Sequence, residues 1–389
     1  MQTFDQVRAQ AMAGDPAAQE LMAQVFEQSG QVDEAVAWLA RAAKAGLPSA
    51  HARLGLWQVV GFGVAQAPAD GVARILAAAG AGDPFGLNLA GILDAGGVGT
   101  PRDPARAVQW LARLAAGGDA SAACQIGLLI GLRGPRLDLA RAALSQAAAA
   151  GYAPAVRILG RKPPRATPVD WTAAAAAVDL SPFEGPIERR VERESPRVRM
   201  ISDLLPDWAC DYVMSLAEPA LVRAKVVDDE TGGEAVRDER SNRVMNFGLA
   251  DSDVVLELIN NRLAAAAEMP PENAEGLGVL HYAVGERYRP HVDYIADTPA
   301  NAPQLAQRGQ RVRTLLVYLN EGFEGGATEF PRLELAYRPP RGSALVFDSV
   351  DAEGAPDPMT LHTGAPPTRG EKWVISKWFR TKALRPPPA

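Results

Sequence analysis

Apolar and small residues recur at helical spacing through the first 160 residues of the chain. The stretches 35–46 (AVAWLARAAKAG) and 107–118 (AVQWLARLAAGG) are rich in Ala and Leu, and both end in Gly, which is a helix-stop signal. In the first stretch Ala35, Leu39 and Ala42 fall at positions i, i+4 and i+7, so they form one apolar stripe. This pattern predicts short helices that pack closely through small side chains.

A short phrase returns through this region as AGDPAA, AGLPSA, AGDPFG, GGDASA and AGYAPA. Successive copies are 32, 36, 36 and 33 residues apart, measured between the glycines at the second position of each phrase, which are Gly14, Gly46, Gly82, Gly118 and Gly151. A period in the thirties is typical of helical solenoids, in which each repeat packs only on its neighbours. The sequence therefore predicts an N-terminal α-helical solenoid over residues 1–160.

Short runs of β-type residues replace the helical pattern beyond residue 196. The runs GLGVLHYAV, RTLLVYLN, SALVFDS and KWVISKWFR are separated by clusters of Gly and Pro, which predict turns. The alternating run 221–229 (LVRAKVVDD) predicts a further strand, whereas residues 206–218 and 251–268 predict helices, the second opened by a capping Asp. Many short strands with Gly and Pro turns indicate a double-stranded β-helix, or jelly roll, with helices packed outside it over residues 196–389.

Residues 161–195 separate the two patterns and predict a Pro-rich linker. The segment 161–170 (RKPPRATPVD) cannot continue a helix, whereas 171–180 (WTAAAAAVDL) predicts a short one. The chain is thus expected to be an α+β protein in two parts, a solenoid and a jelly roll.

Composition and charge narrow the class of protein. The net charge of −6 does not favour general binding to nucleic acid, and no apolar run reaches membrane-spanning length. The N-terminus has no apolar core of a secretory signal, and the two cysteines are far apart with no CxxC. We therefore expect a cytoplasmic protein with no membrane segment, no nucleic-acid partner and no disulfide framework.

His291 and Asp293 are two positions apart in a stretch that predicts a strand. Side chains i and i+2 of a strand face the same way, so an imidazole and a carboxylate would point at one place. A lone H-x-D occurs by chance more often than not, but His362 on a neighbouring strand would complete two nitrogens and one oxygen, the pattern of non-haem iron(II) oxygenases. His281 has Ala283 two positions on, and is expected to be a core or edge residue instead.

Lys372 follows His362 by ten residues, across the turn GAPPTRGE. The strands that flank this turn are expected to pair, which would bring Lys372 back beside the metal. A buried cation needs an anionic partner, and a dicarboxylate that chelates the metal at one end would place its other carboxylate there. Tyr318 could donate a further hydrogen bond. The alternatives are a solvated Lys372 and a Tyr318 that only fills the core.

These residues resemble the 2-oxoglutarate- and iron(II)-dependent dioxygenases of the prolyl 4-hydroxylase type over about residues 196–381. The family pattern Y-x-x-G-x-x-Y-x-x-H-x-D, then Y-L-N, G-G-x-T-x-F and H-x-G-x-P-x-x-x-G-x-K-W, is present throughout. The resemblance implies that His291, Asp293 and His362 ligate Fe(II), that Lys372 with Tyr318 and Tyr282 binds 2-oxoglutarate, and that Arg240 in RSNRV contacts substrate. It also implies O2 as co-substrate, succinate and CO2 as products, and ascorbate as a candidate cofactor.

The repeats resemble Sel1-like repeats, relatives of the tetratricopeptide repeat, over about residues 10–160. Such arrays usually present a concave surface to another protein, so we expect the repeats to recruit a protein or peptide substrate; the alternative is that they only cap or dimerise the enzyme. The leading hypothesis is a hydroxylase of a prolyl or other residue in a protein. The alternatives are a hydroxylase of a free amino acid or small metabolite, and a non-catalytic scaffold or sensor.

Overall fold

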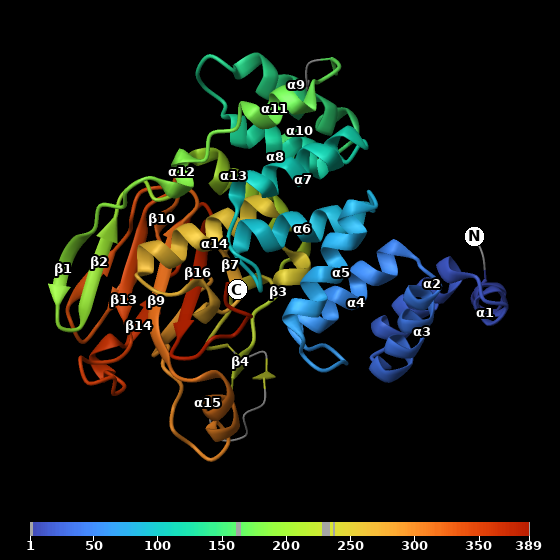
Figure 1. Cartoon of the computed structure of the whole chain (residues 1–389). Helices are drawn as coiled ribbons and strands as arrows, with labels where there is room; N and C mark the ends of the chain where they lie inside the picture. The colour runs from blue at the N-terminus through green and yellow to red at the C-terminus, as the bar shows by residue number, and fades with distance from the viewer. Residues whose placement is uncertain (1–2, 161–164, 228–233, 236–237, 389) are drawn as a thin grey trace.

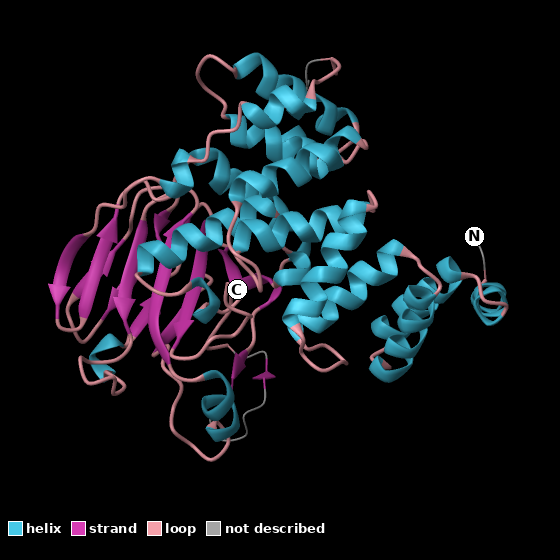
Figure 2. Cartoon of the chain, in the orientation of Figure 1, coloured by secondary structure: helices cyan, strands magenta, loops and turns pink. Residues whose placement is uncertain are grey.

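The chain folds into a helical array and a β-rich part that lie against each other (Figure 1). The structure is a computed structural model, and it describes residues 3–160, 165–227, 234–235 and 238–388. Figure 2 shows that the helices gather in the first half of the chain and the strands in the second. The two-part α+β architecture predicted from the sequence is confirmed.

The array is built from helices that pack as antiparallel neighbours along the chain, with α2 on α3, α4 on α5, α6 on α7 and α8 on α9. Their bounds are α1 (Phe4–Met12), α2 (Pro16–Gln28), α3 (Val32–Lys44), α4 (Pro48–Val60), α5 (Pro68–Gly80), α6 (Pro84–Gly96), α7 (Pro104–Ala116), α8 (Ala120–Ile130), α9 (Leu137–Ala149) and α10 (Ala153–Leu159). The array runs from the free N-terminal end towards the β-rich part, as a solenoid does (Figure 1).

The recurring phrase forms the turn that joins one helix pair to the next. Its Gly adopts a positive φ in every copy, from 81° at Gly151 to 97° at Gly14, which an L side chain rarely adopts. In the first copy the Asp15 side chain then accepts a hydrogen bond from the backbone N–H of Ala18 and caps α2, while Pro16 occupies its first turn. Each copy of the phrase therefore ends one helix and begins the next, and the period read from the sequence is the length of one helix pair with its turns.

A buried carboxylate ties two helices of the array together. Asp94 on α6 is fully buried and accepts hydrogen bonds from Arg106 Nε at 2.6 Å and from Trp110 Nε1 at 2.8 Å, both on α7. A buried charge with these partners holds one relative placement of the two helices, because leaving it unpaired would be costly.

The segment between the two parts carries structure of its own. Its elements are α11 (Trp171–Ala176), α12 (Ser181–Glu184) and β1 (Arg190–Glu194). Helix α11 packs against α7 and α8, α12 packs against α14, and β1 is the edge strand of the larger sheet. The short helix predicted here is confirmed, and residues 161–164 of the predicted linker lie outside the described residues. The described residues of this segment therefore pack partly on the array and partly on the β-rich part.

The β-rich part contains a larger and a smaller antiparallel sheet. The larger has the order β1-β2-β13-β9-β16-β7-β6-β3 and the smaller β12-β11-β14-β8, with short pairs β10-β15 and β4-β5. The remaining strands are β2 (Arg197–Ile201), β3 (Val222–Arg223), β4 (Val226–Val227), β5 (Glu234–Ala235), β6 (Arg243–Phe247), β7 (Leu277–Tyr282), β8 (Tyr288–His291), β9 (Arg311–Tyr318), β10 (Glu324–Gly325), β11 (Thr328–Phe330), β12 (Leu335–Tyr337), β13 (Ala344–Asp348), β14 (His362–Gly364), β15 (Pro367–Arg369) and β16 (Lys372–Arg380). The remaining helices are α13 (Asp207–Ala217), α14 (Val254–Ala267) and α15 (Ala302–Arg308), with 3₁₀ turns η1 (Glu218–Ala220), η2 (Leu249–Asp251), η3 (Pro271–Asn273) and η4 (Pro358–Thr360).

The continuous strand predicted over 221–229 is wrong, because this run is divided between two partners. Strand β3 pairs with β6, whereas β4 pairs with β5. Between β3 and β4 the buried Ala224 donates its backbone N–H to the carbonyl of Asn242. Residues 228–229 of the predicted strand lie outside the described residues.

The two faces of the larger sheet belong to two different cores. On β16, the odd-numbered Ile375 and Phe379 pack in one core with the helices, whereas the even-numbered Val374 packs in another with Phe330 and Phe347. This follows from the alternation of side chains along a strand. The second core lies between the two sheets, which is the arrangement of the predicted jelly roll.

Helix α14 joins the sheet to the array (Figure 1). All its residues except Asn261 and Ala265 are buried, and it packs against α6, α7, α8 and β9. The capping Asp predicted for it is Asp253, whose side chain accepts a hydrogen bond from Leu256 N–H. Within the described part of the chain, no helix has the length and apolar character that crossing a bilayer requires.

Candidate metal centre

His291 and His362 lie opposite each other on paired strands of the smaller sheet. They are register partners between β8 and β14, and their ring centroids are 4.3 Å apart. The Nδ1 atom of His291 lies 2.7 Å from the carbonyl oxygen of Arg289, and that of His362 lies 3.0 Å from the carbonyl of Thr360. A carbonyl only accepts, so each ring carries its proton on Nδ1 and leaves the Nε2 lone pair free for a ligand.

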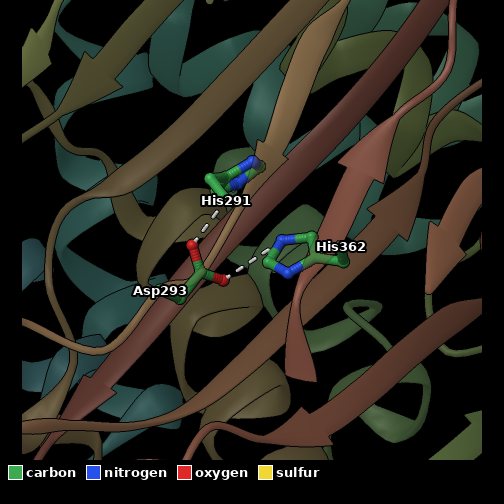
Figure 3. Close-up of side chains that lie close together, drawn as sticks. All are labelled: His291, Asp293 and His362. Carbon is green, nitrogen blue, oxygen red and sulfur yellow. Dashed lines mark ion pairs between the residues drawn. The ribbon is translucent and has the colours of Figure 1, made fainter. Parts of the chain in front are cut away.

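Asp293 completes the cluster, although β8 ends at His291 and the aspartate lies just beyond the strand. Its Oδ1 is 3.7 Å from His291 Nε2 and its Oδ2 is 3.6 Å from His362 Nε2 (Figure 3). The Thr314 hydroxyl on β9 donates to Oδ2 at 2.6 Å and so fixes the carboxylate from the larger sheet.

The environment sets the charges of these groups. Burial, reinforced by the neighbouring His362, lowers the pKa of His291 to about 3, so its imidazole is neutral at physiological pH. Burial alone would raise the pKa of Asp293, but His362, His291 and the Thr314 hydroxyl outweigh it and hold that pKa below its ordinary value. The cluster therefore presents two imidazoles, of which that of His291 is neutral, and one carboxylate.

This donor set fits a metal ion. One atom each of His291, Asp293 and His362 can be chosen so that all lie within 4.8 Å of one another. Two imidazole nitrogens and one carboxylate oxygen on a single side are the ligands typical of non-haem iron(II), with positions left open for other molecules. The convergence predicted from the H-x-D spacing is present in the folded chain.

Lys372 lines the same pocket as the three residues of the cluster. It is only 2% exposed, and its Nζ lies 5.1 Å from the ring centroid of Tyr282 and 4.9 Å from that of Tyr318. Burial lowers its pKa to about 7, against a weak opposing effect of Glu329. Within the described part of the chain, this ammonium contacts two aromatic faces and forms no ion pair with a carboxylate, which a buried cation requires.

The reason given in the sequence analysis for the position of Lys372 is wrong. The strands that flank the turn after His362 do not pair, because β14 belongs to the smaller sheet and β16 to the larger one. Instead Lys372 pairs in register with Tyr282 on β7. The turn carries the chain from one sheet to the other, so the lysine faces the cluster across the space between the sheets.

The two tyrosines differ in their availability. Tyr282 lines the pocket, and its hydroxyl would lie 3.3 Å from a Cβ added at Gly364, so the glycine of the H-x-G motif makes room for it. Tyr318 is fully buried, and its hydroxyl lies 2.8 Å from Thr328 Oγ1 and 3.3 Å from the carbonyl of Tyr337. Its hydroxyl is thus engaged within the protein, whereas its ring supports Lys372.

Arg240 also lines the pocket, and it is held in place by its neighbours. Its guanidinium lies 4.7 Å from the ring centroid of Tyr288, and that ring stacks on His291 at 3.5 Å. Its Nε donates to Asn242 Oδ1 at 3.1 Å. Arg240, Tyr288 and His291 therefore form one layered stack at the side of the pocket.

Two residues of the pocket region were missed from the sequence. Thr314 anchors Asp293, and Trp378 lines the pocket with a buried Nε1 that has no hydrogen-bond partner among the described residues. Both lie on the inner face of their strands, in step with Tyr318 on β9 and Lys372 on β16. The alternation that placed His291 and Asp293 could have found them.

Comparison with known proteins supports this picture. Residues 277–380 match the family model of the 2OG-Fe(II) oxygenase superfamily. Prolyl 4-hydroxylase 1 of Arabidopsis thaliana is 34% identical over 213 residues, which cover 51% of this chain and 74% of the relative.

Two solved structures are similar to the chain, each over less than half of its length. A viral collagen prolyl hydroxylase from Paramecium Bursaria Chlorella virus-1, in its 2OG complex, is 25% identical and covers 46% of this chain and 94% of its own, with a TM-score of 0.35. A Sel1 repeat protein from Oxalobacter formigenes is 29% identical and covers 45% of this chain and 75% of its own, with a TM-score of 0.35.

Proposed function

The chain belongs to the prolyl 4-hydroxylase family of 2-oxoglutarate- and iron(II)-dependent oxygenases, and we propose that it hydroxylates a prolyl residue of a protein or peptide. The observation that carries the proposal is the convergence of His291, Asp293 and His362 in one pocket with the buried Lys372. When bound, iron(II) with 2-oxoglutarate and O2 supplies the chemistry that converts C–H to C–OH and releases succinate and CO2.

The chain's own residues would hold and orient the reactants. His291, Asp293 and His362 would ligate iron through atoms whose orientation is already fixed by the carbonyls of Arg289 and Thr360 and by the Thr314 hydroxyl. Such outer contacts restrict the tautomer and angle of each ligand before the metal arrives.

Lys372 would hold the far carboxylate of 2-oxoglutarate. Its ammonium is buried between the rings of Tyr282 and Tyr318, and an incoming carboxylate would restore the charged form that burial disfavours. Tyr282 lines the pocket and is available as a further donor, whereas Tyr318 would act through its ring alone because its hydroxyl is engaged. Arg240 would lie on the substrate side, fixed by Tyr288 and Asn242.

We assign the helical array to recruitment of the protein substrate, while its inner repeats also support the catalytic part. Helix α14 is covered by α6, α7 and α8, so removal of residues 1–160 would expose an apolar surface and confound the test. Recruitment is better examined by substitutions on the exposed face of the outer repeats. Ascorbate stays a prediction, to be tested by turnover with and without it.

The test of the function uses Pro-containing peptides with iron(II), 2-oxoglutarate and O2. Wild-type protein should form succinate and add about 16 Da, one oxygen atom, to a proline of the peptide. His291→Ala and Asp293→Ala should abolish both products, while His281→Gln, at a histidine that contacts Glu371 outside the pocket, should retain them. Wild-type turnover in the first two variants would refute the assignment. If free amino acids gain an oxygen atom and no peptide does, the substrate would be a small metabolite and not a protein.

A further inference from the structure

A second cavity lies between the array and the β-rich part. It has a volume of about 240 Å³, and its walls include Val60 and Gln66 beside the α4–α5 turn, Phe247 at the end of β6, and Leu384 and Pro386 of the C-terminal segment. None of the residues that line it lines the metal-centre pocket. Figure 1 shows the C-terminal end of the chain in this position, between the array and the larger sheet.

Lys377 points into this cavity from β16. It is five positions beyond Lys372 on the same strand, so the two side chains face opposite sides of the sheet. Lys377 is 3% exposed and donates one hydrogen bond, from Nζ to Asn260 Oδ1 at 2.8 Å. Among the described residues its ammonium forms no ion pair with a carboxylate within 4.0 Å, although the charges of Glu257 and Glu275 act on it from farther away. A buried ammonium with a single neutral partner is poorly compensated.

The carboxylates that line the cavity are already occupied by arginines. Glu257 accepts from Arg385 at 2.7 Å and from the Ser252 hydroxyl at 2.8 Å. Glu275 accepts from Arg311 at 2.7 Å and from Arg380 at 2.5 Å, so it is shared by two cations.

The rim adds another positive group, because Arg308 at the end of α15 also lines the cavity. With Glu257 paired to Arg385 and Glu275 shared by two arginines, Lys377 and Arg308 are left as positive groups facing the space. When Lys377 is protonated, the cavity therefore has an excess of positive charge, and it also offers apolar walls at Phe247, Leu249 and Leu384.

From this arrangement we infer that the cavity is a binding site for a small anion that carries a carboxylate or phosphate group, held by Lys377 and Arg308. The volume is below the range usual for drug-sized ligands, which selects a compact molecule. The anion would contact both parts of the chain, because the walls come from the array, the sheet and the C-terminal segment. This site is separate from the proposed 2-oxoglutarate pocket and does not depend on its assignment.

Binding should be linked to proton uptake. Burial lowers the pKa of Lys377 to about 7, with Arg385 acting in the same direction and Glu257 and Glu275 opposing it. An anion in the cavity would favour the ammonium and raise this pKa, as would the loss of Arg385. At pH 8 the lysine of the empty site is mostly neutral, so each bound anion should bring close to one proton with it.

The experiment is isothermal titration calorimetry of the full chain at pH 8 and constant ionic strength, without metal. Inorganic phosphate and citrate are titrated in separate arms, in two buffers of different ionisation enthalpy. Wild type is compared with Lys377→Met, with Arg308→Gln at an exposed residue, and with Lys372→Met as the control on the opposite face of the same strand.

Saturable binding of phosphate or citrate with proton uptake is expected in wild type and in Lys372→Met, and the arm that binds identifies the anion class. Lys377→Met should weaken binding at least tenfold and abolish the proton uptake, and Arg308→Gln should weaken binding several-fold. The inference is overturned if neither anion binds wild type. It is equally overturned if both Lys377→Met and Arg308→Gln bind as wild type does, or if the Lys372→Met control loses the binding.

Discussion

Replacing Lys372 by Met should stabilise the protein without co-substrate and weaken co-substrate binding. The ammonium is 2% exposed, and burial lowers its pKa from 10.5 to about 7. At 1.36 kcal/mol per pKa unit, this difference corresponds to a penalty of about 4–5 kcal/mol for the charged form. Loss of the contacts with the Tyr282 and Tyr318 rings offsets about 1–2 kcal/mol of it. Met keeps the length and contacts aromatic rings well, so the net gain at pH 7 should be about 2–3 kcal/mol.

The gain should depend on pH in a defined direction. The pKa of Lys372 is lower in the folded protein than in the unfolded chain, so the unfolded chain binds more protons between about pH 7 and pH 10.5. The penalty is full below pH 7 and vanishes above about pH 10.5. Wild-type stability should therefore rise with pH relative to Lys372→Met, and the advantage of the variant should shrink to about 0–1 kcal/mol by pH 9.

Urea unfolding at pH 7 and pH 9 measures the stability difference, and turnover gives the KM for 2-oxoglutarate. Leaving the far carboxylate without its buried partner costs about 2–5 kcal/mol, so KM should rise at least about 30-fold. Lys377→Met removes a buried ammonium from the other face of β16 and should leave this KM unchanged. A Lys372→Met protein that is less stable than wild type at pH 7, or that keeps the wild-type KM, would refute the reasoning.

Two further predictions concern single contacts. Thr314→Val removes the hydrogen bond to Asp293 Oδ2 and should weaken iron(II) affinity about 10–100-fold with little change in the KM for peptide, measured by anaerobic metal titration and steady-state kinetics; unchanged iron affinity would contradict the positioning role. Asp94→Asn removes the buried carboxylate that accepts hydrogen bonds from Arg106 and Trp110, while the exposed Arg106 stays hydrated, and it should destabilise the array by about 1–3 kcal/mol. Chemical denaturation measures this loss, with Asp103→Asn as an exposed control, and equal stability of the two variants would contradict it.

Local chemistry explains what the sequence could predict. The glycines of the recurring phrase could be predicted as helix stops because such a stop needs a residue that tolerates a positive φ. All five of them, from Gly14 to Gly151, adopt a positive φ. The strands of the jelly roll were recognisable for a similar reason, since their alternation reflects the two cores that the larger sheet separates. The same alternation predicted that His291 and Asp293 converge, and they do, although β8 ends at His291 and Asp293 lies just beyond the strand.

Local sequence patterns could not predict which distant segments of the chain pair with each other. The expected pairing of the strands around Lys372 was wrong although the lysine does reach the pocket, because sheet membership depends on the topology of the whole domain and not on the length of one turn. The division of residues 221–229 between β3 and β4 likewise reflects which partners the chain meets, β6 for one and β5 for the other. The sequence could therefore identify Lys372 as a site residue and still predict the wrong strand pairing for it.

The burial of α14 decides how the role of the repeats can be studied. Its sequence, VVLELINNRLAAAA, has apolar and small residues on nearly every side, which a helix covered only by a sheet would not need. One side packs against β9 and the other against α6, α7 and α8. Gly91 of α6 approaches so closely that an added Cβ would lie 2.9 Å from Val254 Cγ2. The inner repeats are therefore part of the catalytic part's core. The buried residues of the outer helices α1 to α3 form separate clusters, so exposed residues of these helices can be altered to test recruitment without disturbing the fold that holds the metal ligands.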